Sequence, residues 1–286
     1  MIARTISVAV ALTLSLAWSG QAARQMEYLG RGVVVVNQGE GRVFVSWRWL
    51  ATDPDDIAFN VYRSADGGAP VKLNQAPITA VTCFAETNAA LNLKTSYFVR
   101  PVIGSREQQD SPSFIFPSNA LARPYLAVPL QLPPGYTAND ASVGDLDGDG
   151  EYEIVLKSEQ RPRDTASTGL TGQTILQGYK LDGTLLWTIN LGRNIREGAH
   201  YTQFMVYDLD GDGIAEIACK TADGTIDGKS KVIGDANADW RETNSSSRTF
   251  GRILKGPEYF TIFDGRTGAA LVTTNYITTL GRWPSR

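Results

Sequence analysis

The chain has 286 residues, of which 42% are hydrophobic and 20% are charged, which is ordinary for globular protein and enough for two domains. Thirty acidic residues against 27 basic ones give a net charge of −3. This balance lacks the basic field that general nucleic-acid binding requires, so we expect no nucleic-acid partner.

The first 22 residues have the pattern of a secretory signal peptide. Arg4 precedes an apolar run from Ile6 to Trp18, and small residues surround Ala22 at the expected cleavage position. A run of about 13 residues is too short to span a bilayer. We therefore expect residues 1–22 to be removed and the mature protein to be secreted, with no membrane partner.

Residues 24–117 are predicted to form a small β-sandwich. They contain seven short runs rich in β-branched and aromatic residues, separated by turn signals such as Asp66-Gly67-Gly68. The runs are Gly32–Val36, Val43–Trp47, Ile57–Tyr62, Val71–Leu73, Val81–Phe84, Tyr97–Ile103 and Ser113–Phe116. Their density is typical of fibronectin type III or immunoglobulin-like domains, and no catalytic constellation falls within them. Repeated prolines then predict a linker over 118–138.

A nine-residue acidic pattern at 145–153 returns at 208–216 with identical spacing. Carboxylates at positions 1, 3 and 5 converge only if the backbone wraps around a common centre, and glycines at positions 4 and 6 permit the bends. Oxygen ligands favour Ca²⁺, with the backbone carbonyl of position 7 and the acid at position 9 completing the shell. The predicted ligands are Asp145, Asp147, Asp149, Glu151 and Glu153, and then Asp208, Asp210, Asp212, Ile214 and Glu216. The competing interpretation is a pair of solvated Asp/Gly-rich turns without metal.

From residue 139 onward the chain consists of repeated units. Each acidic loop lies between two predicted strands and is followed by a strand pair with an Asp-Gly turn, at Asp182 and at Asp264. About four strands per roughly 60 residues are typical of a propeller blade, so 139–286 is predicted to be a partial, calcium-stapled β-propeller.

The second unit carries an insertion of 19 residues, because the Asp-Gly turns lie 82 residues apart and the acidic loops only 63. Within it, Asp235, Asn237 and Asp239 alternate like a third calcium site, although Trp240 stands where a glycine would follow. A plain polar loop is the alternative.

Residues 125–286 hold about two and a half such units, whereas a closed propeller needs at least about four blades. The chain therefore either assembles with other chains or is the N-terminal part of a longer protein. We favour the second interpretation.

Seven strings of residues between 24 and 275 carry a resemblance to a known family. They are Arg24–Glu27, Leu29–Val33, Ile57–Arg63, Ala138–Gly150, Gly192–Arg196, Gly198–Asp208 and Lys220–Thr225. They resemble the rhamnogalacturonan lyases of polysaccharide lyase family 11. The resemblance implies a secreted, calcium-rich, eight-bladed propeller preceded by a β-domain, a monomer at full length, which cuts the rhamnogalacturonan I backbone of pectin by β-elimination.

The resemblance also implies two sugar-binding positions. Asn139 and Glu159 match positions at which the family contacts sugar in a central cleft. The family has Trp-Asp where this chain has Ser158-Glu159, so a stacking surface is lost and the second contact is weakened. Alternatively, Asn139 caps a turn before its strand.

Basic side chains are further candidates, because elimination beside a carboxylate needs a cation and a proton acceptor. Lys157 and Lys220 end equivalent strands and either bind uronate or project into solvent. His200, the only histidine, suits a general base or packs as a hydrogen-bonded strand residue. Arg193 and Arg196 bind carboxylates or are simply exposed. None of these residues is assigned as catalytic.

The sequence therefore favours a secreted, calcium-dependent rhamnogalacturonan lyase of which this chain is an incomplete N-terminal part. Two alternatives stay open. One is a non-catalytic, calcium-dependent carbohydrate-binding or adhesion propeller, and the other is an inactive fragment.

Overall fold

The computed structural model describes residues 27–164, 166–198 and 202–276. Every regular element in these ranges is a β-strand, which confirms the predicted all-β class. No helix long and apolar enough to cross a membrane occurs in them. The predicted signal peptide at 1–22, His200 and the residues after 276 lie outside the described ranges.

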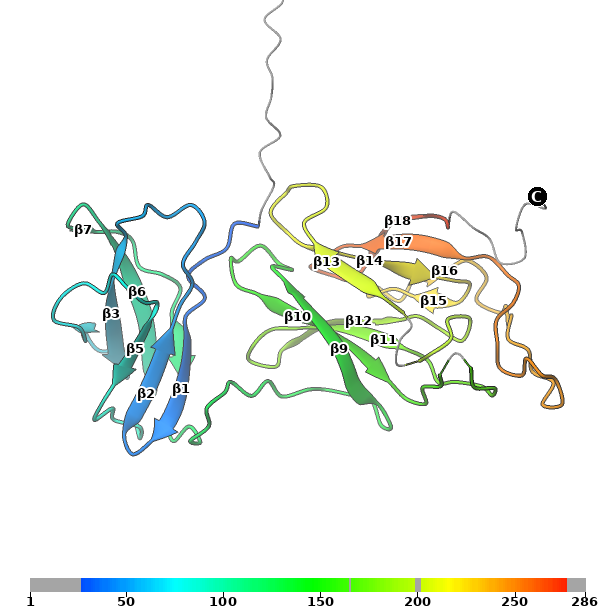
Figure 1. Ribbon diagram of the computed structural model, residues 1–286, viewed down its shortest axis with the longest axis horizontal. Coiled ribbons are helices and arrows are strands. Elements are labelled where there is room, and N and C mark those ends of the chain that lie inside the picture. The colour runs from blue at the N-terminus through cyan, green and yellow to red at the C-terminus, as the bar shows by residue number, and fades with distance from the viewer. Residues whose placement is uncertain (1–26, 165, 199–201, 277–286) are drawn as a thin grey trace, which may run out of the picture.

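Strands β1 to β8 form two antiparallel sheets, with the order β1-β2-β5 in one and β4-β3-β6-β7 in the other, where β8 also pairs with β6 (Figure 1). They are β1 Val34–Gly39, β2 Arg42–Ser46, β3 Ala58–Ala65, β4 Val71–Lys72, β5 Cys83–Glu86, β6 Thr95–Ile103, β7 Arg106–Glu107 and β8 Phe114–Phe116. Alternating residues of β1 and β2 are buried, and Val43 and Val45 share a core with Val61 and Tyr97 of the second sheet. All seven predicted strands are present, with ends displaced by at most three residues.

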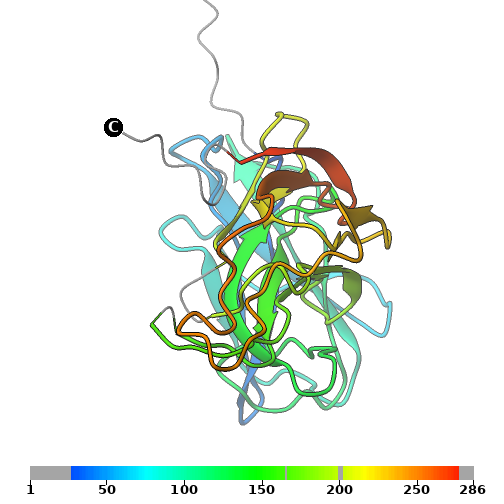
Figure 2. The ribbon, with the colours of Figure 1, turned by 90° about the vertical axis from the view of Figure 1, so that its right-hand side faces the viewer.

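Strands β9 to β18 form two further antiparallel sheets, which Figure 2 shows in front of the N-terminal part. Each sheet contains a four-stranded meander, β9-β10-β11-β12 in the first and β13-β14-β17-β18 in the second. The bounds are β9 Thr137–Gly144, β10 Glu153–Glu159, β11 Ile175–Tyr179, β12 Leu185–Asn190, β13 Phe204–Tyr207, β14 Glu216–Thr221, β17 Tyr259–Phe263 and β18 Ala270–Asn275. Strand β9 begins at Thr137, so the last two residues of the predicted linker 118–138 lie in this strand.

One apolar core joins the two meanders. It includes Val155 and Leu176 of the first sheet, Ile217 of the second, and two residues of the connecting loops, Leu146 and Ala215, all fully buried. Burial of apolar surface stabilises the fold by about 25 cal/mol per Å² removed from water. Leu146 and Ala215 therefore fix the loops that contain them between the two sheets.

The insertion predicted in the second unit contains a short hairpin that joins the other sheet. Its strands are β15 Thr225–Ile226 and β16 Val232–Ile233. Asn190 of β12 pairs with Ile226, so the hairpin extends the first meander to six strands. The insertion thus links the two units.

The N-terminal part contacts the loop between β9 and β10. The Gly30 amide donates to the Gly150 carbonyl at 2.6 Å. The Arg48 guanidinium donates to the same carbonyl at 3.2 Å, approaches Glu151 at 3.4 Å and lies 4.5 Å from the centre of the Tyr152 ring. Gly150 has φ 85, and a Cβ there would lie 3.0 Å from the Gly30 nitrogen, so glycine permits both the bend and the contact.

Candidate functional site

The first acidic loop, residues 145–153, is shaped by its own carboxylates. Asp145 is buried and accepts hydrogen bonds from the amides of Gly148 at 2.7 Å and Gly150 at 2.8 Å. Glu153, the first residue of β10, reaches back to accept from the Leu146 amide at 2.8 Å. The backbone therefore wraps around the two buried carboxylates, which stand at positions 1 and 9 of the pattern.

The second acidic loop, residues 208–216, repeats this pattern. Asp208 accepts from the amides of Gly211 at 2.6 Å and Gly213 at 3.0 Å. Glu216 accepts from the Leu209 amide at 2.8 Å. Two loops in different sheets thus share one hydrogen-bond scheme, because their carboxylates and glycines have the same spacing.

Each acidic loop gathers three carboxylates that could hold a metal ion. One oxygen from each residue lies within 4.8 Å of the others in two clusters, Asp145, Asp147 and Glu153, and Asp208, Asp210 and Glu216. Carboxylates this close repel one another unless a cation lies among them. Burial raises the pKa of Glu153 to about 7 and raises the pKa of Glu216. The all-oxygen set fits a hard divalent cation.

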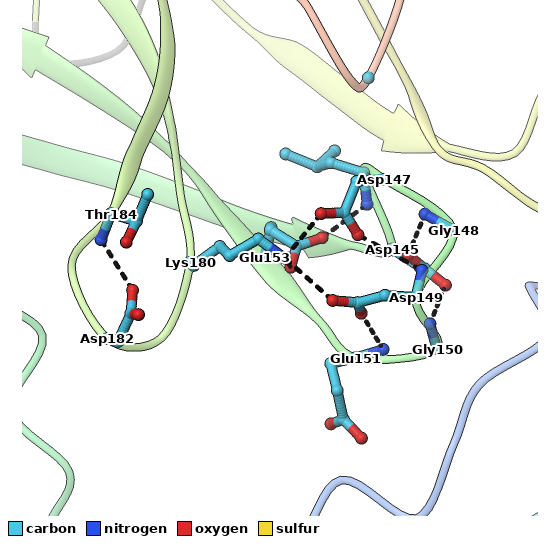
Figure 3. Close-up of polar contacts among 12 residues, drawn as sticks. Asp145, Asp147, Gly148, Asp149, Gly150, Glu151, Glu153, Lys180, Asp182 and Thr184 are labelled. Atoms are coloured by element: carbon cyan, nitrogen blue, oxygen red, sulfur yellow. Dashed lines mark hydrogen bonds and ion pairs between the residues drawn. The ribbon is translucent and has the colours of Figure 1, made fainter. Parts of the chain in front are cut away.

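Lys180, which the sequence analysis did not identify, lies among the carboxylates of the first acidic loop (Figure 3). Its ammonium is 2.6 Å from Asp147, 2.9 Å from Asp149 and 3.7 Å from Glu153. Burial opposes its charge, but the hydrogen bonds to Asp147 and Asp149 outweigh burial, so the pKa of Lys180 is raised. A metal ion in this loop must therefore share these carboxylates with Lys180 or displace it.

The other predicted ligands lie in the loops but outside the two clusters. Asp149 and Asp212 each accept from the amide two residues later, that of Glu151 at 2.9 Å and that of Ile214 at 2.9 Å. The side chain of Glu151 leaves the loop and accepts from the Gly32 amide at 3.2 Å. Glu151 therefore also connects the loop to the N-terminal part.

The third predicted calcium site has two carboxylates, Asp235 and Asp239, and both of them contact protein groups. Asp239 forms an ion pair with Arg241 at 2.6 Å, and Asp235 accepts from the Asn237 amide at 2.8 Å. The buried Asp223 instead organises this loop by accepting from the Asp235 amide at 3.0 Å. A metal ligand role for Asp235, Asn237 and Asp239 stays a prediction.

Asn139, Lys157 and Glu159 are brought together with Asp140 at the end of β9 and β10 that lies away from the acidic loop. We call these four residues the β10-end cluster. The Lys157 ammonium is 2.7 Å from Asp140 and 3.9 Å from Glu159. Asn139 donates to Glu159 at 3.2 Å. The Lys157 side chain is 1% exposed, so the alternative that it projects into solvent is wrong.

The remaining basic candidates lie elsewhere. Lys220 is partly exposed and pairs with Glu258 at 2.8 Å. Arg193 is exposed, whereas the Arg196 guanidinium donates to three backbone carbonyls between residues 167 and 251. Through these three bonds Arg196 holds the surrounding loops together. His200 lies outside the described residues.

The Asp140–Lys157 pair had a signal in the sequence, and the Lys180 contact did not. Gly144 pairs with Glu153 across the hairpin, and regular counting outward from this pair predicts position 140 opposite position 157, where opposite charges stabilise the strands. In the structure a register shift between Leu156 and Ser158 interrupts the ladder at this point, and the two side chains still meet. Lys180 reaches the loop because β11, which it follows, pairs with β10. No local sequence pattern predicts that pairing.

Two protein-family models together match most of the chain. Residues 128–285 match the model described as rhamnogalacturonan lyase family 11, C-terminal domain. Residues 24–115 match the model described as rhamnogalacturonan I lyases beta-sheet domain.

Two curated relatives from Bacillus subtilis (strain 168) are each 50% identical to the chain. The rhamnogalacturonan endolyase YesW matches over 266 residues, 89% of this chain and 40% of the relative. The rhamnogalacturonan exolyase YesX matches over 264 residues, 88% of this chain and 40% of the relative. The chain thus spans about two fifths of the length of these relatives.

Solved structures agree with the sequence comparison. A Bacillus licheniformis rhamnogalacturonan lyase PL11 is 54% identical with a TM-score of 0.78, covering 91% of this chain and 43% of that chain. The crystal structure of YesW gives 50% identity and a TM-score of 0.79, with the same coverage of 91% and 43%.

Proposed function

The chain belongs to rhamnogalacturonan lyase family 11, and we propose that the whole protein of which it is part cleaves the rhamnose-galacturonate backbone of pectin by β-elimination. The observation that carries the proposal is the 50% identity with a rhamnogalacturonan lyase over 266 residues, which is 89% of this chain. The chain covers 40% of that relative, so the activity is proposed for the whole protein. One relative is named an endolyase and the other an exolyase, and both are 50% identical to this chain. The proposal therefore concerns the reaction and not whether the polysaccharide is cut internally or at its end.

The β10-end cluster contributes to sugar binding. The Asn139 amide and the Glu159 carboxylate offer a hydrogen-bond donor and an acceptor to sugar hydroxyl groups. Lys157 is held by Asp140 and positions Glu159 through its charge instead of contacting a uronate itself. Elimination removes the proton at C5 of the uronate, so a proton acceptor and a cation beside its carboxylate are also required. Asn139 and Glu159 therefore bind and orient the sugar, and Asp140 and Lys157 hold Glu159 in place.

The arrangement of the sheets supports the finer architecture that we propose. Two sheets around a shared core in the N-terminal part support a sandwich of the fibronectin type III or immunoglobulin-like kind. Two four-stranded meanders, each with an acidic loop between its first two strands, support the first blades of a propeller. Ca²⁺ is the proposed ion of both loops, because oxygen ligands and secretion to a calcium-rich exterior suit it. Its role there is to neutralise the carboxylates and fix the loops.

The test is a lyase assay on the full-length gene product with millimolar calcium. We expect rhamnogalacturonan I to give a rise in ultraviolet absorbance from unsaturated uronate ends, and polygalacturonate, which lacks rhamnose, to give none. A folded, calcium-loaded product that leaves rhamnogalacturonan I uncleaved would refute the lyase proposal.

A carbohydrate-binding or adhesion propeller without catalysis is the second candidate. The observation that favours it is that the acidic loops lie at the opposite end of the strands from the β10-end cluster, so they can stabilise a blade whether or not the protein is an enzyme. Retention on immobilised pectin without shortening of the polysaccharide is the result that this candidate predicts.

A further inference from the structure

A cavity of about 290 Å³ lies at the end of the second meander that is opposite its acidic loop. Thr202 precedes β13, and Lys220 lies near the end of β14. The rest of the lining includes Arg196, Trp240 and Arg252, from the loops around residues 195 and 240–258. We call this the second-unit cavity.

The second-unit cavity occupies the position that corresponds to the β10-end cluster in the other unit. The acidic loops repeat with a spacing of 63 residues, and the same spacing relates Asn139 to Thr202 and Lys157 to Lys220. The equivalent of Asp140 is Gln203, so the strand carboxylate that neutralises Lys157 has no counterpart at the corresponding position. The repeat therefore predicts a related site with a different charge.

That charge is positive. Arg196, Lys220 and Arg252 line the cavity against a single carboxylate, that of Glu258, which pairs with Lys220 at 2.8 Å. In the β10-end cluster, by contrast, two carboxylates surround one lysine. The second-unit cavity is thus suited to an anionic group, and the β10-end cluster to neutral hydroxyls.

Three of the lining side chains have a buried polar atom that makes no hydrogen bond within the described residues. They are the Nε atoms of Arg196 and Arg252 and the hydroxyl of Thr202. A buried donor without an acceptor costs roughly 1–3 kcal/mol, and native proteins contain few of them. Their concentration in one cavity indicates that it receives a ligand rich in acceptor oxygens.

The backbone and the apolar lining support the same conclusion. Thr202 has φ 64, a conformation that is strained for a β-branched residue and that concentrates at binding sites. Trp240 is held by two hydrogen bonds, from its amide to Asn194 at 2.8 Å and from its indole nitrogen to Asp223 at 2.9 Å. A fixed aromatic ring beside a few polar groups is typical of sites for small polar ligands.

We propose that the second-unit cavity is a saccharide subsite that binds a hexuronate through its carboxylate, with Arg252 and Lys220 as the charged contacts and Trp240 as the apolar surface. The inference rests on the proposed function, because the polymer cleaved would supply the uronate. Arg196 fixes the surrounding loops, since its other nitrogens donate to the carbonyls of Ser167, Gly169 and Gly251.

The subsite is connected to the β10-end cluster through Glu197, the neighbour of Arg196. The buried Glu197 carboxylate accepts from the amides of Gln160 and Arg161, each at 2.6 Å, directly after Glu159. The cavity wall is thereby attached to the end of β10. One polysaccharide chain passing over this end of the sheets would present successive sugars to both places.

The experiment compares D-galacturonate with D-galactose, which differ in the carboxylate at C6. Each sugar is titrated into the full chain with calcium present, and binding is followed by ligand-observed NMR. Galacturonate is expected to bind about tenfold or more tightly than galactose. Arg252→Gln is expected to remove that preference, while Arg248→Gln, an exposed arginine of the same loop outside the cavity, is expected to retain it.

Lys220→Gln is the second variant, because Lys220 is half exposed and its replacement does not disturb the core. It is expected to weaken galacturonate binding and to leave galactose binding unchanged. Equal binding of the two sugars by the wild-type chain, or an unchanged preference in folded Arg252→Gln and in Lys220→Gln, would overturn the subsite. Since the lyase assay is independent of this titration, cleavage of rhamnogalacturonan I with no effect of these variants refutes the subsite alone.

Discussion

Lys157 is buried in the candidate site, whereas an ordinary lysine lies at the protein surface. It is 1% exposed, whereas its partner Asp140 is 62% exposed. A buried ammonium depends on a counter-ion, while an exposed carboxylate is stabilised by water. Within this pair, removal of the aspartate, which leaves a buried ammonium without its nearest counter-ion, should therefore cost more stability than removal of the lysine, which leaves an exposed carboxylate in water.

We expect Asp140→Asn to lower the free energy of unfolding by about 2 kcal/mol, because it removes the carboxylate 2.7 Å from the buried ammonium. Lys157→Met combined with Glu159→Gln, which removes both buried charges and keeps side chains of similar size, is expected to cost less than about 1 kcal/mol. Urea denaturation at pH 7 with calcium measures both. Equal costs would contradict the dependence of Lys157 on Asp140.

A second residue-scale prediction concerns pH. Asp53 accepts two hydrogen bonds from Arg31, at 2.5 Å and 2.7 Å. Burial raises the pKa of Asp53, but the bonds from Arg31 outweigh burial and hold it below its ordinary value. A lowered pKa contributes stability above the unfolded-state pKa, and that contribution is lost as the pH falls through the lower folded-state value.

Asp53→Asn is therefore expected to lower Tm by a few degrees at pH 7 and by progressively less below about pH 4. Thermal unfolding of wild type and variant at pH 7, 5 and 3 measures the difference. The exposed Asp55→Asn serves as control and is expected to match wild type at each pH. A difference that stays constant down to pH 3 would show that the ion pair is not its origin.

At the scale of the element, the two acidic loops share a backbone but differ in electrostatics. Both wrap around a buried aspartate and a buried glutamate. Lys180 enters the first cluster, while no ion pair reaches Asp208, Asp210 or Glu216 from the described residues. We therefore expect the proposed metal ion to stabilise the second loop more than the first.

Asp208→Ala is expected to lower the free energy of unfolding by about 3 kcal/mol with millimolar calcium, because it removes a ligand and two amide contacts. Asp182→Ala changes an exposed turn aspartate with one amide contact, to Thr184, and is expected to cost under about 1 kcal/mol. In EDTA the wild type should lose most of its advantage over Asp208→Ala. A wild-type Tm unaffected by EDTA would contradict a metal in the loops.

Lys180→Met tests the difference between the loops. Without its ammonium the first cluster repels itself, so the variant should have a lower Tm than wild type in EDTA. Calcium no longer competes with the lysine, so the increase in Tm on adding calcium should be larger than in wild type. Lys72→Met, an exposed lysine of β4, is the control. Equal calcium responses of Lys180→Met and wild type would show that Lys180 does not compete for the site.

At the scale of the whole molecule, the segment from Glu27 to Gly30 touches both acidic loops. Glu27 accepts from the Asp145 amide at 3.1 Å. The Tyr28 ring lies against Gly213 of the second loop, where a Cβ would approach it to 2.6 Å. The N-terminal part therefore docks on a surface formed by both acidic loops, and the metal ions proposed for these loops would order that surface.

We expect Arg48→Ala to weaken this docking, because Arg48 joins Gly30, Gly150 and Glu151 in one set of contacts. Scanning calorimetry with calcium should give one transition for the wild type and two for Arg48→Ala, one for each part. Arg106→Ala, an exposed arginine of β7, should retain a single transition. A single transition in Arg48→Ala would show that the two parts are coupled by other contacts.

The sequence predicted more of the fold than of the site. All seven N-terminal strands, the two acidic loops and the Asp-Gly hairpins of both units occur where local pattern placed them. The interpretation of Lys157 as a solvated side chain was wrong, because burial of a strand residue depends on what covers it. Lys180 was missed because β11 meets β10 only after a connection of 15 residues, whose path has no short-range signal.

By itself, the sequence determined the all-β class, the positions of the strands, the spacing of the carboxylates and the family. The class, the strand positions and the spacing depend on periodicity and on residues close together in the chain, whereas the family was recognised by the resemblance of longer strings of residues. Only the tertiary structure decided that β15 and β16 extend the sheet of the other unit, that Lys180 enters the first acidic loop, and that Arg252 joins Lys220 in one cavity. Each of these contacts joins segments whose meeting is fixed by the packing of two sheets on a common core, which no local pattern encodes.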